Sequence, residues 1–171
     1  GDIDVFFFTN GGSEANENAM RIARLVTGRH KILARYRSYH GGTAGSLTLT
    51  GDPRRWAMEP GMPGIVHVPH PYHGIQRGSD TAAEALAQLE EIIMLEGAHT
   101  IAAFILETVT GTNGILVPPD GYLEGVRALC DRYGILLICD EVMSGFGRTG
   151  AWFAVDHWKV VPDILTMAKG L

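Results

Sequence analysis

A lysine near the end of the sequence and an acidic residue upstream of it have the clearest chemical use. Lys169 follows the apolar segment 164–168, and Asp140 directly follows the apolar run 135–139. A lysine amine can form a Schiff base with an aldehyde, and a carboxylate can keep a pyridine nitrogen protonated so that the ring accepts electrons from a carbanion. We therefore expect Lys169 and Asp140 to be catalytic residues that hold pyridoxal 5'-phosphate.

A glycine turn could hold the phosphate of such a cofactor. Asn10, Gly11, Gly12 and Ser13 join a predicted strand to a predicted helix. Glycine lets the backbone approach an anion, and a helix N-terminus presents free N–H groups and a positive dipole. We expect Gly12 and Ser13 to bind the phosphate, with Ser13 capping the helix. An ordinary helix cap would give the same sequence, and the turn has no lysine that would indicate a triphosphate.

Four further residues complete the expected cofactor site. Tyr39 could stack on a heterocyclic ring, and His40 beside it is expected near the chemistry. Val142 lies two residues after Asp140, so in an extended chain both side chains point to one face, where Val142 would contact the ring opposite Tyr39. Glu107 ends a neighbouring apolar strand and is expected to hydrogen-bond around the site. The alternatives are simple packing for Tyr39 and a solvated strand end for Glu107.

The apolar patterns predict alternating strands and helices, an order typical of a parallel sheet. The predicted strands are residues 5–8, 31–36, 65–68, 101–107 and 135–139, and the predicted helices are residues 13–28, 41–48, about 81–96 and 121–133. The expected fold class is α/β, a mostly parallel sheet with helices on both faces. Ligands of such sheets bind at the carboxyl ends of the strands, and every candidate residue above lies at such a position.

The composition is typical of one globular domain. Of 171 residues, 46% are hydrophobic and 19% are charged, with a net charge of −5. There is no block of lysine or arginine and no apolar stretch of roughly 20 residues, so we expect neither a nucleic-acid nor a membrane partner. The start lacks a secretory signal, which favours a cytoplasmic protein. We expect Cys130 and Cys139 to be packing residues rather than a disulfide or zinc ligands.

Three other patterns suggest different chemistry but lack the partners that it needs. Residues 135–141 resemble a Walker B strand, without a phosphate loop elsewhere. Residues 145–150 have the glycine spacing of a dinucleotide fold, but they lie several residues past their strand and no clear helix start follows. His67, His70 and His73 lie in a proline-containing stretch that cannot align them on a helix, so we expect no metal site.

With these motifs in place, the chain resembles the class III aminotransferases, pyridoxal-phosphate enzymes of fold type I. The resemblance extends from residue 8 to residue 171. Residues 9–15 are similar to the family's phosphate turn, and residues 39–41 to its ring-stacking segment. Residues 140–142 with 145–150 are similar to its pyridine-nitrogen loop, and residues 168–170 to its Schiff-base site.

The resemblance implies a transaminase in which Lys169 is displaced by the amino substrate and then moves a proton. An amino group would pass from an ω-amino acid or amine to a keto acid such as pyruvate. Residues 111–113 are Gly-Thr-Asn, where many members that use 2-oxoglutarate carry a glutamate after the glycine. The chain is most similar to ω-amino acid:pyruvate and taurine:pyruvate aminotransferases. The alternatives are another class III enzyme such as an aminomutase, a nucleotide-binding α/β module and a noncatalytic structural domain.

The resemblance covers only part of the family's length. Residues 1–171 correspond to the central part of the large, cofactor-binding domain, without the family's N-terminal segment and C-terminal small domain. The missing regions include a threonine that reaches the partner subunit's cofactor phosphate and an arginine that commonly binds substrate carboxylates. The resemblance therefore implies a homodimer or higher homo-oligomer at full length, and we expect residues 1–171 alone to be poorly active.

Overall fold

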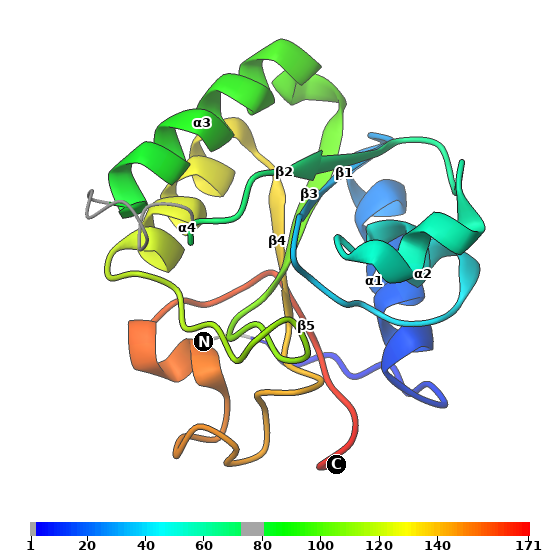
Figure 1. Cartoon of the computed structure of the whole chain (residues 1–171), viewed down its shortest axis with the longest axis vertical. Coiled ribbons are helices and arrows are strands. Elements are labelled where there is room, and N and C mark those ends of the chain that lie inside the picture. The colour runs from blue at the N-terminus through cyan, green and yellow to red at the C-terminus, as the bar shows by residue number, and fades with distance from the viewer. Residues whose placement is uncertain (1–2, 73–80) are drawn as a thin grey trace.

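Five parallel strands form the centre of the computed structural model, which describes residues 3–72 and 81–171 (Figure 1). The strands are β1 (Lys31–Arg35), β2 (Ile65–Val68), β3 (Ile101–Glu107), β4 (Leu136–Asp140) and β5 (Ile164–Thr166). Their order in the sheet is β2-β1-β3-β4-β5, and all neighbouring pairs are parallel. The strand order reverses between β1 and β3, and open α/β sheets bind ligands at such a reversal.

Helices cover both faces of this sheet. The α-helices are α1 (Gly12–Thr27), α2 (Ala44–Leu49), α3 (Thr81–Glu96) and α4 (Tyr122–Tyr133), and short 3₁₀ helices span Pro53–Met58, Ala98–Thr100 and Ala154–Trp158. In Figure 1, α1 and α2 lie on one side of the sheet and α3 and α4 on the other. The expected fold class is confirmed.

Alternate side chains of the central strand β3 fill two separate cores. Phe104 and Leu106 pack in a cluster with residues of α3 and α4, whereas Ala103 and Ile105 pack in a cluster with residues of α1. All residues of β3 are buried. A strand covered on both faces needs apolar residues at every position, which explains the unbroken apolar run in the sequence.

The first helix follows its sequence pattern closely. Ala19, Met20 and Ala23 form its buried face, and it ends at Gly28, which has φ 65°. Only glycine adopts this left-handed conformation without strain, so it commonly ends helices. The other helices and strands predicted after residue 13 agree with the observed ones apart from their end residues.

The prediction of a strand at residues 5–8 is wrong. Val5, Phe6, Phe7 and Phe8 are exposed, and among the described residues no strand includes them. An apolar run forms a strand only where a neighbouring strand offers its backbone groups. The described sheet ends at β2 on one side and β5 on the other, and residues 5–8 pair with neither edge. Strand β5, by contrast, was not expected, because its short span shows no clear period.

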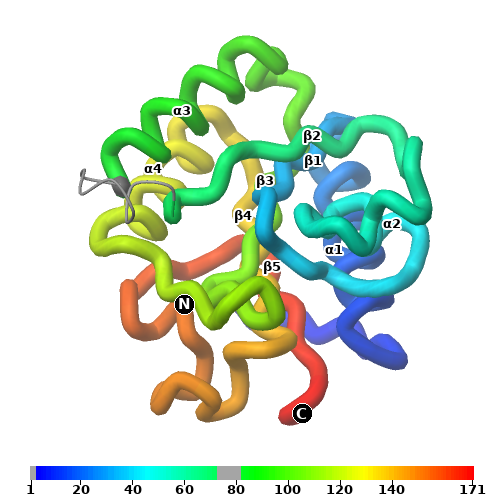
Figure 2. The backbone as a smooth tube through the Cα atoms, in the orientation of Figure 1, coloured from blue at the N-terminus to red at the C-terminus, as the bar shows by residue number. Residues whose placement is uncertain are grey.

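The carboxyl ends of the strands meet at one end of the molecule. In Figure 2, the segments after β1, β3, β4 and β5 and the segment before α1 all come together at the lower end of the view. These are the segments that carry the predicted site residues. The fold therefore brings together residues that are far apart in the sequence.

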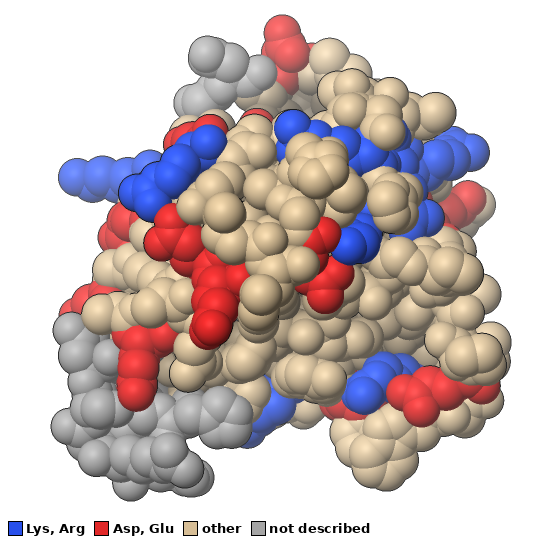
Figure 3. Space-filling model, turned by 90° about the horizontal axis from the view of Figure 1, so that it is seen from above, with Lys and Arg blue, Asp and Glu red and all other residues tan. Residues whose placement is uncertain are grey.

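The surface mixes charges of both signs. On the face seen in Figure 3, basic and acidic side chains are interspersed among uncharged ones, and neither sign covers the face. The phosphate backbone of a nucleic acid is attracted by a broad positive area, and the face in Figure 3 is not covered by positive charge. Within residues 3–72 and 81–171, no helix combines the length and apolar character that crossing a bilayer requires.

Both cysteines are free and buried, which confirms their expected role in packing. Burial raises the pKa of the Cys130 thiol to about 12, and burial also raises the pKa of the Cys139 thiol. Since the thiolate is the reactive form, we predict that a maleimide at pH 8 labels neither cysteine in the native protein and labels both after unfolding. Peptide mapping after labelling checks this, and rapid native labelling at either position would contradict the packing.

Candidate functional site

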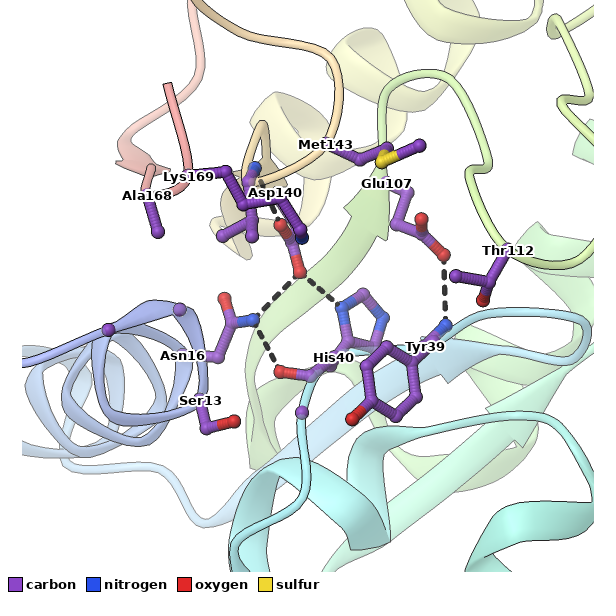
Figure 4. Close-up of a pocket in the computed structure, with 14 residues that line it drawn as sticks. Ser13, Asn16, Tyr39, His40, Glu107, Thr112, Asp140, Met143, Ala168 and Lys169 are labelled. Atoms are coloured by element: carbon purple, nitrogen blue, oxygen red, sulfur yellow. Dashed lines mark hydrogen bonds and ion pairs between the residues drawn. The ribbon is translucent and has the colours of Figure 1, made fainter. Parts of the chain in front are cut away.

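A pocket of about 310 Å³ lies at the carboxyl ends of the strands. All eight predicted site residues line it: Gly12, Ser13, Tyr39, His40, Glu107, Asp140, Val142 and Lys169. Figure 4 labels six of them, which come from α1, from the strand ends and from the chain after β5. The convergence expected from the sequence is therefore present in the structure.

The Asp140 carboxylate lies at the base of the pocket, is only 3% exposed and accepts hydrogen bonds at both oxygens. Oδ2 accepts from Asn16 Nδ2 at 2.7 Å and contacts His40 Nδ1 at 2.9 Å, while Oδ1 accepts from the Val142 N–H at 3.0 Å. An ionised carboxylate can only accept hydrogen bonds. This environment therefore suits a negative charge whose position is fixed.

Asn16 connects three parts of the site, and no sequence motif pointed to it. Its Nδ2 also donates to the His40 carbonyl at 2.7 Å, and its Oδ1 accepts from Thr166 Oγ1 at 2.7 Å. The side chain is buried, on the same helix face as Ala19 and Ala23. A polar residue at an otherwise apolar helical position is the signal that could have identified it.

Val142 reaches the pocket by a different route from the one expected. The strand ends at Asp140, and the chain turns so that the Val142 N–H bonds back to Oδ1 of Asp140. Both side chains still line the pocket. The turn brings Val142 onto α1, where a Cβ atom on Gly12 would lie 2.9 Å from the Val142 methyl groups. Glycine at position 12 is therefore required for this close approach.

The start of α1 differs from the prediction for Ser13. The N-cap residue is Gly11, without a side-chain cap hydrogen bond, and Ser13 lies inside the first turn. Its Oγ accepts a hydrogen bond from the Gly42 N–H at 3.0 Å, so the hydroxyl hydrogen points elsewhere. Asn10 donates to Glu14 and does not line the pocket. The uncapped helix start at Gly12 and Ser13 can thus present N–H groups to an anion.

The His40 ring is buried and lies beside the Asp140 carboxylate. Its Nδ1 contacts Asp140, the backbone N–H of His40 donates to Thr50 Oγ1 at 3.0 Å, and the residue is 2% exposed. The buried Nε2 has no hydrogen-bond partner among the described residues. His40 therefore helps to fix the same carboxylate oxygen that Asn16 contacts, and Figure 4 shows the two contacts meeting at this atom.

Glu107 is buried, so the alternative of a solvated strand end is wrong. Its Oε1 accepts from the Tyr39 N–H at 2.9 Å and its Oε2 from the Gly111 N–H at 2.8 Å. Burial raises the pKa of Glu107, the charge of Asp140 adds to this, and His40 and the two N–H groups oppose it. Glu107 thereby connects the backbone after β1 with the turn after β3.

Lys169 reaches the pocket from the segment after β5 (Figure 4). Its φ of 53° lies in the left-handed region. Such a conformation costs energy for a residue with a side chain and is concentrated at functional sites. An adjoining cavity of about 350 Å³ shares Lys169, Val142 and Met143 with the pocket and extends to Phe146 and Arg148. Lys169 thus stands between the two cavities.

The other sequence patterns take part in local structure. Residues 145–150 form turns beside the pocket, and no α-helix follows them. His67 contacts the Thr50 carbonyl through Nε2 at 3.1 Å and stacks on Tyr36, and His70 stacks on Tyr72. His73 lies outside the described residues.

Taken together, the pocket offers groups for three parts of one ligand. The helix start can bind an anion, the Asp140 carboxylate can pair with a protonated ring nitrogen, and Lys169 can react with a carbonyl carbon. Tyr39 and Val142 supply an aromatic and an aliphatic wall. The structure is thus an α/β domain with a pocket whose groups suit a phosphorylated heteroaromatic aldehyde.

Residues 1–171 match the family described as Aminotransferase class-III, and the chain belongs to that family. It is 47% identical to the uncharacterized aminotransferase YhxA of Bacillus subtilis, over 98% of this chain and 39% of that protein. It is 41% identical to a hypotaurine/taurine–pyruvate aminotransferase of Paracoccus denitrificans, over 96% of this chain and 38% of that protein. These findings confirm the resemblance to class III aminotransferases.

A solved structure supports the same relationship. The taurine:2-oxoglutarate aminotransferase of Bifidobacterium kashiwanohense, solved with PLP and glutamate, superposes with a TM-score of 0.92 and 50% identity, over 96% of this chain and 39% of that one. The chain therefore spans about two fifths of the length of these relatives.

We predict that Asn16→Ala lowers the free energy of unfolding of the full-length apo-protein by about 1–3 kcal/mol, because it leaves buried partners unsatisfied. Asn18→Ala on the same helix is the matched control. Asn18 is only partly buried and bonds to Glu14, so its replacement should change the free energy by no more than about 0.5 kcal/mol. Chemical denaturation measures both, and equal effects of the two substitutions would contradict the role of Asn16.

Proposed function

We propose that this chain carries the cofactor site of a pyridoxal 5'-phosphate-dependent aminotransferase. The reaction would move an amino group from an amine or ω-amino acid to a keto acid. The observation that carries the proposal is the buried Asp140 carboxylate, fixed by Asn16, His40 and the Val142 N–H in a pocket that Lys169 also lines. A fixed carboxylate and an accessible lysine are the two groups that this cofactor needs from a protein.

The residues of the pocket fit this cofactor. Its volume of about 310 Å³ lies within the range of small-ligand sites. The N–H groups of Gly12 and Ser13 would hold the phosphate, with the Ser13 hydroxyl free to donate. Tyr39 and Val142 would contact the two faces of the ring, and Asp140 would face the ring nitrogen.

The roles of the remaining groups follow from their contacts. His40 would keep Asp140 in place, and Glu107 would fix the backbone of Tyr39. When bound, the cofactor supplies an aldehyde carbon that takes up the amino group and a ring that stores electrons. Lys169 Nζ would be the covalent anchor and then the acid and base that carries a proton. Asp140 would keep the ring nitrogen protonated.

The substrates follow from the relatives and from the turn after β3. Two of the relatives named above are a hypotaurine/taurine–pyruvate aminotransferase and a taurine:2-oxoglutarate aminotransferase. Thr112 lines the pocket, and the resemblance to class III aminotransferases implies a glutamate at this position in many members that use 2-oxoglutarate. We therefore favour pyruvate as the keto acid and a small ω-amino acid or amine as the donor.

The chain would be the central part of the large domain of a longer enzyme. We expect this enzyme to be a homodimer or higher homo-oligomer in the cytoplasm, and residues 1–171 alone to be poorly active. The exposed side chains of Phe6, Phe7 and Phe8 support an assembled state, because large apolar groups are usually covered.

Borohydride reduction of the full-length protein with pyridoxal 5'-phosphate tests the proposal. We predict that mass spectrometry finds a pyridoxyl group on the peptide that contains Lys169, because Lys169 is the lysine of the pocket. Lys169→Ala should remove this adduct, whereas Lys159→Ala, outside the pocket, should keep it. Absence of an adduct on folded protein, or an adduct on another lysine in the unmodified sequence, would contradict the proposal.

A further inference from the structure

One face of the Tyr39 ring is covered by a positively charged group. The Arg54 guanidinium carbon lies 3.9 Å from the ring centroid. Tyr39 and Thr112 line the pocket and Arg54 does not, so the guanidinium contacts the ring from a position outside the pocket lining. A cation over an aromatic face is attracted to it. The ring is therefore held from outside.

Polar contacts fix this guanidinium in one place. Its Nε donates to both oxygens of Asp52 at 3.0 Å, and its Nη2 donates to Asp52 Oδ2 and, at 2.7 Å, to Thr112 Oγ1. The Asp52 side chain is buried and also accepts from Asn113 Nδ2 at 3.0 Å. A forked, partly buried pair of this kind is more ordered than a simple surface ion pair.

These contacts join two walls of the pocket across the reversal of strand order. Tyr39 follows β1, whereas Thr112 follows β3. On the inner side, the Glu107 carboxylate connects the two segments through the Tyr39 and Gly111 N–H groups. On the outer side, Arg54 connects them through the Tyr39 ring and the Thr112 hydroxyl. The backbone of Tyr39 and its ring are thus held by separate groups.

We infer that Arg54 is a positioning residue, which fixes the tilt of the Tyr39 ring and its distance from the turn at Thr112. This inference rests on the proposed function, because the ring is fixed in order to stack on the cofactor. A ring that is free to tilt would lose part of its contact and would pay an ordering cost on binding. Arg54 itself stays outside the pocket and acts only through its neighbours.

The test measures cofactor affinity in the full-length protein, by absorbance titration of the apo-form with pyridoxal 5'-phosphate. We predict that Arg54→Ala raises the Kd about 5- to 10-fold and weakens the circular dichroism induced in the bound cofactor. Arg54→Lys should restore only part of the affinity, because an ammonium group lacks the planar fork. Thr112→Val, which removes one contact, should have a smaller effect of the same sign.

Arg55→Ala is the matched control, since Arg55 pairs with Glu59 and lies over Tyr36 rather than Tyr39. It should leave the Kd unchanged. In a Tyr39→Leu background, Arg54→Ala should have no further effect on the Kd, because the ring through which it acts is gone. The same loss in both backgrounds would overturn the inference, as would unchanged affinity and circular dichroism in Arg54→Ala.

If Arg54→Ala does not fold, Arg54→Lys and Thr112→Val decide the question by the same two readouts, and unchanged values in both would overturn the inference. The proposed function is tested separately, by the adduct at Lys169. If the unmodified protein forms no adduct at Lys169, the proposed function is wrong. If it forms the adduct and the Arg54 variants bind the cofactor as tightly, only the positioning role is wrong.

Discussion

The burial of one carboxylate constrains the rest of this structure. A charge that is taken out of water is tolerated only if donors replace the lost hydration, and Asp140 has no donor within its own strand. Its hydrogen-bond partners come from α1, from the segment after β1 and from the turn that follows Asp140 itself. The crossover topology must therefore bring all three to the end of β4, and the fold and the site depend on the same hydrogen bonds.

Close packing and a second carboxylate extend this constraint outward. The turn after Asp140 can pack on α1 only because residue 12 is a glycine. Glu107 is the register partner of Asp140 in the pairing of β3 with β4. It connects the segments after β1 and β3, as Asp140 connects α1 with the segment after β1. Arg35 is also buried, and its guanidinium donates to the Glu107 carbonyl at 2.6 Å, which helps to fix the end of β3. The pocket walls are thus fixed by hydrogen bonds between polar groups that themselves line the pocket, supported by Arg35 outside it.

Much of this arrangement was predictable from the sequence, because strand ends are marked by polar residues after apolar runs. The residues in that position include Lys169, Asp140, Tyr39 and Glu107, and parallel topology alone brings them together. The local backbone conformation was harder to predict from the sequence. The turn that bends Val142 back to Asp140 and the helix start at Gly12 depend on single hydrogen bonds, and no periodic pattern encodes them. Asn16 was missed because its partners lie far away in the sequence, and residues 5–8 were misassigned because apolarity does not specify a pairing partner.

The most direct test of this account is the rate of the first half-reaction, from amine to keto product, in full-length protein with Asp140→Asn. An amide at this position keeps the shape of the side chain but removes the charge that would keep the ring nitrogen protonated. The account predicts that Lys169 still binds the cofactor while the rate falls by about 10²-fold or more, and that Asp120→Asn, on the exposed loop before α4, leaves it unchanged. A rate in Asp140→Asn close to that of the unmodified protein would contradict the central role of this carboxylate.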